Sequence, residues 1–352
     1  MHLNDLFISE HISIKDAIKK LDDTAKKILL VTTNDDTLLG IVTDGDVRRW
    51  ILKNGEMSEN VSLIMNKEPK FIYEKDITHA KEILKEKMIE AIPVLNRDKQ
   101  VIDIVFWNDK FNRKLNYFEK LENPVVIMAG GKGTRLEPYT KILPKPLIPI
   151  GDTPIVERII NRFNEYGCSN YYMTVNYKKS MIKAHFNDIA RSYSVGYIEE
   201  DNPLGTAGSL YLLKDKLKDT FFVSNCDILI EGNYSDMMKY HKENNNKITL
   251  ISSLKHYTIP YGVIEIDDVT SGARKMVEKP EYDYLVNTGM YILEPDCLKD
   301  IPENSFYHIT ELINQYIENG EKIGVYPVSE NAWLDMGQFT EMENMLEKLG
   351  VK

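Results

Sequence analysis

Apolar residues in the first third of the chain recur with an offset of 63 residues. In each copy, three of them follow the three- and four-residue spacing of one helix face, and the others fall in two short runs typical of strands. The matched positions are Ile14, Ala17, Leu21, Leu29, Val31, Ile41, Val42 and Asp46 in one copy, and Ile77, Ala80, Leu84, Ile92, Val94, Ile104, Val105 and Asp109 in the other. Each copy therefore predicts a helix, a strand, a turn, a second strand and a polar loop.

A half-unit of this kind cannot cover its own sheet, so we expect the two copies to pair. Residues 116–123 are polar and charged and are followed by Pro124, which is typical of a linker. The pattern thus predicts an N-terminal module at residues 1–118, with repeats at about 1–60 and 61–118, and a second domain at residues 119–352.

Beyond the linker, short apolar runs alternate with segments of helical spacing, as an α/β sheet with helices on both faces requires. The runs at 125–129, 171–175, 195–199 and 221–224 predict strands, and the segments at 154–167, 179–191 and 338–349 predict helices. Ligands of such sheets bind beyond the carboxyl ends of the strands, so we expect the functional site there.

Size and charge narrow the classes of partner. The 352 residues suit two domains, and apolar runs of about five residues are far short of the roughly 20 that span a bilayer. The net charge of −10 is uneven, with 20 basic against 21 acidic residues in 1–120 but 24 against 33 in the remainder. This acidic surface argues against nucleic-acid binding. A polyanionic substrate would therefore be held by a few local cations and a metal ion.

Cysteine usage and the first residues indicate a cytoplasmic protein. Cys168, Cys226 and Cys297 are odd in number and widely spaced, which is typical of reduced thiols. The N-terminus shows no basic segment followed by an apolar one, so we expect no export signal. The seven histidines lack metal-ligand spacing and no Cys-x-x-Cys occurs, which argues against a zinc site.

The most informative chemistry lies at residues 128–147, directly after a predicted strand. This stretch reads Met-Ala-Gly-Gly-Lys-Gly-Thr-Arg-Leu-Glu-Pro-Tyr-Thr-Lys-Ile-Leu-Pro-Lys-Pro-Leu. Glycines let backbone N–H groups approach a phosphate closely, and Arg135 and Lys145 are cations that can neutralise it. It is not a Walker loop, because Lys132 is followed by Gly133 rather than by Ser or Thr.

The same stretch resembles the signature of sugar-phosphate nucleotidyltransferases, also called nucleotide-sugar pyrophosphorylases. The resemblance implies a Rossmann-like, doubly wound α/β domain with a mixed sheet. In the reaction it implies, a sugar 1-phosphate oxygen attacks the α-phosphorus of a nucleoside triphosphate and pyrophosphate leaves. Catalysis would consist of positioning and charge neutralisation. The loop residues implied to bind the nucleotide are Ala129, Gly130, Gly131, Gly133 and Thr134.

The resemblance also assigns catalytic and ligand-binding roles outside the loop. Arg135 would contact the β- and γ-phosphates, Lys145 the α-phosphate, and Lys279 the sugar phosphate. Asp227, at the end of an apolar run, and Asp335, in Trp333-Leu-Asp-Met-Gly337, would hold Mg²⁺ through oxygen ligands. The other implied contacts are Gly205 and Thr206 along the nucleoside, and Tyr261, Gly262, Glu278 and Asn287 around the sugar.

The N-terminal repeat resembles a tandem pair of CBS (cystathionine β-synthase) domains. Gly40-Ile-Val-Thr-Asp-Gly-Asp46 matches the nucleotide loop of that family, in which Thr43 and Asp46 would meet the phosphate and ribose of an adenine or guanine nucleotide. The second copy has Phe106-Trp-Asn-Asp109 instead and lacks the hydroxyl, so we expect at most one nucleotide site. A purely structural or dimerising module is the alternative.

The order of the two domains is similar to that of glucosamine-1-phosphate guanylyltransferases of bacterial legionaminic acid synthesis. This analogy favours GTP and glucosamine 1-phosphate in a homo-oligomeric enzyme. Mannose, heptose and glucose 1-phosphates, and UTP or dTTP, stay open. A non-catalytic nucleotide sensor is disfavoured by the intact Arg135, Lys145, Asp227 and Asp335. A cytidylyltransferase of the isoprenoid or molybdenum-cofactor type is disfavoured by the Pro-Lys-Pro-Leu and Trp-Leu-Asp segments.

Overall fold

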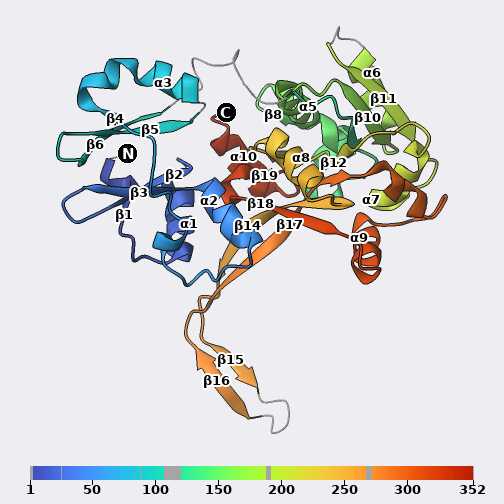
Figure 1. The fold of residues 1–352 in the computed structure, drawn as a ribbon. Helices are drawn as coiled ribbons and strands as arrows, with labels where there is room; N and C mark the ends of the chain where they lie inside the picture. Colours follow the sequence, from blue (N-terminus) through green and yellow to red (C-terminus); the bar gives the residue numbers. More distant parts are fainter. Residues whose placement is uncertain are drawn as a thin grey trace.

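Two small three-stranded sheets and one large sheet organise the molecule (Figure 1). The computed structural model describes residues 3–24, 26–87, 89–106, 120–187, 192–266 and 272–351. Most of the predicted linker, and residues 107–109 of the second predicted nucleotide loop, lie outside this range. No helix in the described part of the chain combines the length and apolar character that crossing a membrane requires.

The N-terminal module contains two copies of one strand arrangement. In each copy the first strand runs parallel to the second, and the third is antiparallel to the second. The strands are β1 (Phe7–Ile8), β2 (Ile28–Thr32) and β3 (Leu38–Thr43), then β4 (Ile72–Tyr73), β5 (Ala91–Leu95) and β6 (Val101–Phe106). The helices are α1 (Ile14–Thr24), α2 (Asp44–Leu52) and α3 (Ala80–Lys87), with 3₁₀ turns at Leu3–Leu6, Val61–Leu63 and Glu74–His79.

The strand register repeats at the spacing that the sequence predicts. Ile28 pairs with Thr43 in the first copy, and Ala91 pairs with Phe106 in the second. One helix prediction is wrong at its start, because Ile77 lies in the 3₁₀ turn before α3 and is 39% exposed. Ile77 therefore lies outside the buried face that Ala80 and Leu84 form, each of which is 1% exposed.

The large sheet has the strand order β11-β10-β7-β12-β17-β14-β18. Strands β11, β10, β7 and β12 are parallel, and β17 is antiparallel to both of its neighbours, so the sheet is mixed as expected. Its strands are β7 (Val125–Met128), β10 (Asn170–Val175), β11 (Ser194–Glu199), β12 (Phe221–Asn225), β14 (Ile248–Thr258), β17 (Glu281–Leu293) and β18 (Ile323–Val328).

Helices cover both faces of this sheet, and alternation along β7 explains the two cores. Val125 and Ile127 point into one cluster and Val126 into the other, because successive side chains of a strand point to opposite faces. The first face is covered by α5 (Ile155–Glu165), α6 (Lys179–Asn187), α8 (Tyr234–Glu243) and α10 (Phe339–Lys348). The second is covered by α7 (Gly205–Gly208), the 3₁₀ turns Ser209–Leu213 and Pro295–Asp300, and α9 (Ile309–Glu318).

Short strand pairs and turns complete the domain. The pairs are β8 (Pro149–Ile150) with β9 (Thr153–Pro154), β13 (Ile228–Ile230) with β19 (Trp333–Asp335), and β15 (Val263–Ile266) with β16 (Ala273–Val277). The remaining short elements are the helix α4 (Tyr139–Ile142) and the 3₁₀ turns Thr134–Leu136, Lys145–Leu147 and Glu330–Ala332. Strands β14 and β17 continue past the sheet as a two-stranded ribbon that leads to β15 and β16, which project from the body of the molecule (Figure 1).

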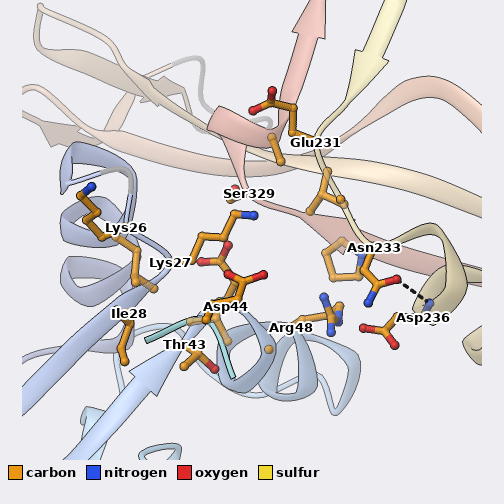
Figure 2. Close-up of a pocket in the computed structure, with 18 of the residues that line it drawn as sticks. Lys26, Lys27, Ile28, Thr43, Asp44, Arg48, Glu231, Asn233, Asp236 and Ser329 are labelled. Carbon is orange, nitrogen blue, oxygen red and sulfur yellow. Dashed lines mark hydrogen bonds between the residues drawn. The ribbon is translucent and has the colours of Figure 1, made fainter. Parts of the chain in front are cut away.

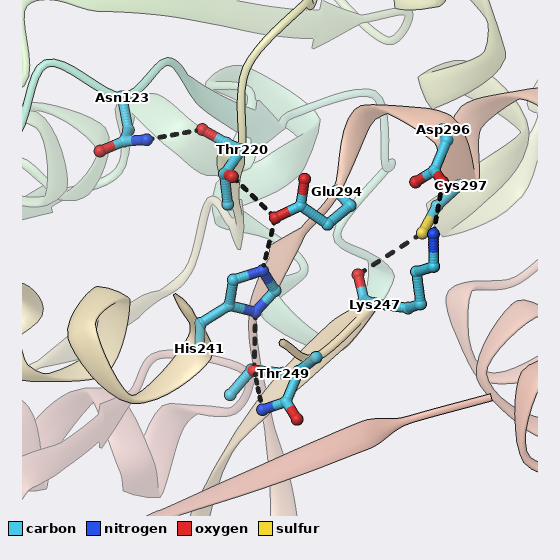
Figure 3. Close-up of polar contacts among 9 residues, drawn as sticks. Asn123, Thr220, His241, Lys247, Thr249, Glu294, Asp296 and Cys297 are labelled. Atoms are coloured by element: carbon cyan, nitrogen blue, oxygen red, sulfur yellow. Dashed lines mark hydrogen bonds and ion pairs between the residues drawn. The ribbon is translucent and has the colours of Figure 1, made fainter. Parts of the chain in front are cut away.

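A buried polar network lies at the end of the sheet opposite the expected site (Figure 3). His241 contacts Glu294 at 3.0 Å and Thr249 at 2.8 Å through its two ring nitrogens, and the Thr220 hydroxyl donates to Glu294 at 2.7 Å. Burial lowers the pKa of His241, although Glu294 opposes the shift. Since Asn123 donates to the Thr220 carbonyl at 2.8 Å, the network also fixes the segment that enters the domain.

The N-terminal module packs against the large domain through named contacts. Lys15 pairs with Asp283 at 2.9 Å on the ribbon, and Asn331 donates to the Asp22 carbonyl at 2.7 Å. The Arg48 guanidinium lies over the ring of Tyr326 on β18, 4.6 Å from its centroid. These contacts come from α1 and α2, so the first copy supplies them.

Candidate active site

The glycine loop leaves β7 at the carboxyl edge of the sheet, where the sequence predicts the site. Ala129 is buried and its N–H donates to the Thr174 carbonyl at 3.0 Å, which fixes the start of the loop beside β10. Gly133 has φ +68°, and a Cβ there would lie 2.9 Å from a Thr140 methyl and 3.1 Å from the Lys145 Cβ. Only glycine fits both the backbone conformation and this space.

The loop residues on either side of Gly133 are open. A Cβ at Gly131 would meet no atom within 4 Å, so its backbone is accessible to a ligand. Thr134 and Arg135 follow in a 3₁₀ turn, and both are exposed. Among the residues that the structure describes, the Arg135 guanidinium has no hydrogen-bond or ion-pair partner. A free guanidinium directly after a glycine loop is suited to bind phosphate oxygens.

Lys145 and Asp227 form an ion pair next to the loop, and each side chain is 16% exposed. Asp227 follows β12, whose carboxyl end lies beside that of β7 because the two strands are parallel. Lys145 begins a 3₁₀ turn between two prolines, and its stem packs against Gly133. The structure therefore brings together the loop, the lysine and the first predicted metal ligand, although 82 residues separate Lys145 from Asp227.

The second predicted metal ligand reaches the same place through the β13–β19 pair. Asp335 pairs in register with Ile228, and the Met336 N–H donates to the Asp227 carbonyl at 2.8 Å. Burial raises the pKa of Asp335 above its ordinary value, and the negative charge of Asp227 raises it further. The Gly337 N–H donates to one Asp335 oxygen at 2.8 Å, which orients the carboxylate.

Two close carboxylates fit a divalent cation. Mg²⁺ is commonly held by one or two carboxylates, with waters and substrate phosphates completing its shell. No group of three or more His, Cys, Asp or Glu side chains able to hold a metal occurs in the described part of the chain. Asp227 and Asp335 would therefore hold the ion jointly with a bound triphosphate. The preceding Cys226 is buried, which raises the pKa of its thiol to about 12 and makes it a poor nucleophile.

A buried acid that the sequence analysis did not single out lies on the other side of the loop. Glu200 is 5% exposed, and a Cβ at Gly130 would lie 2.7 Å from its Oε1. Its other oxygen accepts from the Leu204 N–H at 3.1 Å, and burial raises its pKa. In the sequence, Glu200 follows another glutamate at the end of a predicted strand, a pattern typical of exposed residues. Its burial becomes visible only in the structure, where β10 pairs with β7 and with β11.

The second glycine turn is tightly packed. Gly205 has φ +76°, and a Cβ there would lie 2.6 Å from the Tyr307 carbonyl oxygen. That oxygen accepts from the N–H groups of Ala207 and Gly208, while the Thr206 hydroxyl accepts from Ile309 N–H at 3.0 Å. Packing against residues 305–309 explains these small residues, and the contact of Gly205 and Thr206 with a nucleoside stays a prediction.

The predicted sugar-binding residues divide into two places. Asn287 lies where β17 passes the end of β12, and Gly289 approaches Asn225 so closely that a Cβ would be 2.3 Å from its Nδ2. The others, Tyr261, Gly262, Glu278 and Lys279, form a separate group on the projecting ribbon. Within that group the Lys279 N–H donates to the Tyr261 carbonyl at 3.3 Å. Asn287 lies six strand positions beyond Glu281, the start of β17, which is about 20 Å of strand, and Lys279 lies two residues before that start. The structure does not bring Lys279 to the Lys145–Asp227 pair.

In the N-terminal module, Thr43 and Asp46 cap helix α2. The Thr43 hydroxyl donates to Asp46 at 2.6 Å, the Thr43 N–H donates to the same carboxylate at 2.9 Å, and Arg49 also pairs with Asp46. Thr43 lines a cavity of about 1180 Å³ between the module and the large domain, and Asp46 does not. The structure thus uses Asp46 as a capping residue, and its contact with a nucleotide stays a prediction.

Comparison with known proteins defines the family. The family model described as Nucleotidyl transferase matches residues 124–350, and a CBS domain model matches residues 1–53. The chain therefore belongs to the nucleotidyl transferase family, with CBS-type sequence in its first repeat.

Individual relatives are similar over the same region. The chain is 30% identical over 221 residues to the probable mannose-1-phosphate guanylyltransferase 2 of Oryza sativa subsp. japonica, and 31% identical over 221 residues to the mannose-1-phosphate guanyltransferase of Saccharomyces cerevisiae. Each match covers 60% of this chain and 61% of the relative. The structure of HddC from Yersinia pseudotuberculosis matches with a TM-score of 0.51 at 23% identity, covering 64% of this chain and 99% of HddC, which supports the fold.

Proposed function

We propose that this protein is a sugar-1-phosphate nucleotidyltransferase. The observation that carries the proposal is the convergence of the glycine loop, Lys145, Asp227 and Asp335 at one edge of the sheet in a member of the nucleotidyl transferase family. Charged groups that neutralise a triphosphate, without a nucleophilic side chain, fit a direct phosphoryl transfer. The alternative of a non-catalytic nucleotide sensor would not need both carboxylates beside the lysine.

In the proposed reaction, a sugar 1-phosphate oxygen forms a bond to the α-phosphorus of the triphosphate. The bond from that phosphorus to the bridging oxygen breaks, and pyrophosphate leaves with the electron pair. Lys145 is placed to stabilise charge on the α-phosphate, and Arg135 to bind the phosphates that leave. Mg²⁺ held by Asp227 and Asp335 would supply further charge neutralisation at the triphosphate.

The buried Glu200 supports guanine as the base. Guanine presents two adjacent donors, N1–H and the N2 amino group, which a carboxylate can accept together. Glu200 lies against Gly130 of the loop, so a base stacked near the loop would be within its reach. The names of the relatives point the same way, since they are guanylyltransferases. We therefore propose GTP as the donor.

Two arguments point to different sugars. The relatives named above act on mannose 1-phosphate, whereas the order of the two domains favours glucosamine 1-phosphate. For Lys279 and Glu278 to contact either sugar, the projecting ribbon would have to bend toward the site. We propose a hexose 1-phosphate as the acceptor and leave the choice to the assay.

The deciding experiment measures pyrophosphate release by the full chain with GTP, UTP, dTTP and ATP, each paired with glucosamine, mannose, heptose and glucose 1-phosphates. We expect turnover with GTP and one of these sugars, and its loss in Asp227→Asn with the far-UV circular dichroism unchanged. Absence of turnover with every pair, in protein that still binds nucleotides, would favour the sensor. Near-normal rates in Asp227→Asn would remove that residue from the mechanism.

We further propose that the N-terminal module, residues 1–118, is regulatory and that the enzyme is a cytoplasmic homo-oligomer. The three cysteines are buried free thiols, in keeping with a reducing compartment. Sedimentation velocity of the full chain tests the oligomeric state, and a monomer at all concentrations would contradict it. Thr43→Phe should spare catalysis and alter only a nucleotide response, because Thr43 lies far from the glycine loop in the N-terminal module.

A further inference from the structure

The ribbon that projects from the large domain carries an exposed apolar face (Figure 1). Ile264 pairs with Met276 across β15 and β16, and Ile266 lies two residues beyond Ile264 on the same side. All three side chains are at least 58% exposed. A two-stranded ribbon is only marginally stable in water by itself, and a contiguous exposed apolar face marks an interaction surface. We therefore expect this face to dock on a protein surface.

The same ribbon carries residues that the proposed site needs. A Cβ at Gly262 would lie 2.7 Å from the Met276 methyl and 3.0 Å from a Glu278 oxygen, so Glu278 lies on the apolar side. Lys279 follows with φ +46°, a conformation that lysine rarely adopts, and its N–H donates to the Tyr261 carbonyl at 3.3 Å. Strained backbone of this kind clusters at functional sites. The residues assigned to the sugar thus lie beside the apolar face.

Within one chain, these residues would reach the site only if the ribbon bent, and the strand pairing opposes bending. β14 is paired with β17 at every position from Ser252 to Thr258. The register shifts between Ile251 and Ser252, at the base of the ribbon, but the Thr288 hydroxyl donates there to the Ile251 carbonyl at 2.6 Å. Bending at this point would break hydrogen bonds of the sheet.

The N-terminal module also holds the base of the ribbon. Lys15 pairs with Asp283 at 2.9 Å. Lys19 pairs with Glu281 at 2.5 Å. The cavity between the two domains (Figure 2) is lined by no described residue from 257 to 285. A ligand in that cavity would therefore leave the apolar face uncovered, and a different surface must cover it.

An exposed apolar patch lies beside the proposed active site and matches this face. Tyr139 and Ile142, on the short helix α4 that follows the glycine loop, are 50% and 73% exposed. The Tyr139 ring lies 5.7 Å from the ring of Phe339, at the start of α10. The Thr140 hydroxyl donates to the Gly133 carbonyl at 3.1 Å, which ties α4 to the glycine loop. A ribbon resting on this patch would bring the residues beside its apolar face next to the loop.

We propose that the ribbon of a second copy of this chain docks on this patch, and that the second copy supplies Lys279, Glu278 and Tyr261 to the sugar end of the site. A two-fold pair satisfies both copies at once, because each ribbon covers the patch of the other. The described ribbon, residues 257–266 and 273–285, is comparable in length with the roughly 20–30 residues that a standard interface uses on each side. The assignment of the three residues to the sugar rests on the proposed function, whereas the docking does not.

Chemical cross-linking tests the docking without turnover. Full chains with Met276→Cys are co-expressed with differently tagged chains with Ile142→Cys and treated with a short bismaleimide. The three native cysteines are buried. We expect the doubly tagged dimer to form about tenfold faster or more than with the control Ile317→Cys, because docking raises the effective concentration of the two thiols. Ile317 lies on α9 and is 56% exposed. Equal rates with both partners, or no dimer, would overturn the docking.

Mixed oligomers test the sharing of the site. Asp227→Asn removes a proposed metal ligand and Lys279→Gln removes the cation of the ribbon, so each variant alone should lose about 100-fold or more in turnover. Equal co-expression of the two variants should restore about one quarter of wild-type turnover, because in a quarter of the sites an intact Asp227 meets an intact Lys279 of the other copy. No recovery in chains that still cross-link would overturn the sharing.

The control mixture is wild type with a chain that carries both substitutions. Sharing between copies predicts about one quarter of wild-type turnover, whereas sites within single chains predict about one half. A wild-type chain without turnover, whose ribbon is still cross-linked to the patch of another copy, would overturn only the proposed function.

Discussion

At the scale of single residues, the site contains buried carboxylates whose negative charge lowers the stability of the fold. Asp335 and Glu200 are both buried enough to have raised pKa values, and neither forms an ion pair with a cation in the described structure. Lys145 lies near enough to oppose the pKa shift of Asp335, but its ion pair is with Asp227. Such uncompensated carboxylates are typical of a site that waits for a cationic or hydrogen-bond-donating ligand.

Asp335→Asn should lower turnover by about 100-fold or more, because one charge-neutralising group at the triphosphate is lost. The same variant should be more stable than wild type at neutral pH. The folded pKa of Asp335 is raised, so its contribution to stability is complete at low pH and is lost as pH rises through that pKa. Thermal unfolding between pH 4 and 8 measures this. The Asn side chain can still accept from Gly337 N–H.

Asp152→Asn is the control for that comparison, since the Asp152 side chain is 92% exposed and, among the described residues, its only ion pair is a 3.6 Å contact with Arg158. Its unfolding temperature should stay close to that of wild type at each pH, because a substitution at an exposed site changes the stability little. If Asp335→Asn unfolds at a lower temperature than Asp152→Asn across this pH range, the carboxylate stabilises the fold and the argument from burial is wrong.

Glu200→Gln should change the choice of base. A glutamine amide offers one donor and one acceptor, so it cannot accept both donors of guanine but can pair with the donor and acceptor of uracil or thymine. We expect turnover with GTP to fall by about 100-fold, and the ratio of UTP to GTP rates to rise. Glu199→Gln is the control on the neighbouring, more exposed position, and a similar loss in both variants would remove Glu200 from base recognition.

At the scale of elements, apolar spacing predicts the buried strands and helices well, because burial on one face imposes a period. Helix α5 was expected at residues 154–167 and is Ile155–Glu165, with Ile155, Ile159 and Phe163 buried as its spacing predicts. The projecting ribbon could not be predicted in this way. Ile264, Ile266 and Met276 are at least 58% exposed, so their apolar character carries no information about a core. Glu200 was missed because a glutamate at a strand end is expected to be exposed, whereas here residues of neighbouring strands bury it.

The glycine loop allows a matched test at this scale. Gly133→Ala should lower the free energy of unfolding by about 1–2 kcal/mol, because alanine is disfavoured at positive φ and its Cβ would meet Thr140. It should also weaken GTP binding, since the loop must shift. Gly131→Ala meets no atom within 4 Å, so its stability should stay close to that of wild type. Chemical denaturation of both variants measures the difference, and equal losses would contradict the steric argument.

At the scale of the whole molecule, the two domains meet through polar contacts and one cation–π contact, along with limited apolar packing. Leu254, from β14 of the large domain, belongs to a buried cluster of the N-terminal module that draws mainly on the first repeat. The motifs predicted that two domains exist, but their relative placement depends on contacts between Lys15, Lys19 and the ribbon that have no sequence pattern. Interfaces of this kind permit relative motion of domains.

The docking of the N-terminal module should therefore depend on pH through Glu281. Lys19 holds the pKa of Glu281 below its ordinary range, and Lys15 adds to the effect. A lowered folded pKa means that the contact stabilises above the ordinary glutamate range and is lost as pH falls through the folded value. Hydrogen–deuterium exchange of residues 14–20 and 281–285, corrected for intrinsic rates, should show protection at pH 7 that decreases as pH falls below the ordinary glutamate range. In Glu281→Gln this protection should already be weaker at pH 7 and less sensitive to pH, because only the Lys15–Asp283 pair remains, and added salt should weaken it in wild type. If the variant keeps full protection at pH 7, the ion pairs of Glu281 do not hold the module in place, and the Lys15–Asp283 pair, Asn331, Leu254 and the Arg48–Tyr326 contact must do so.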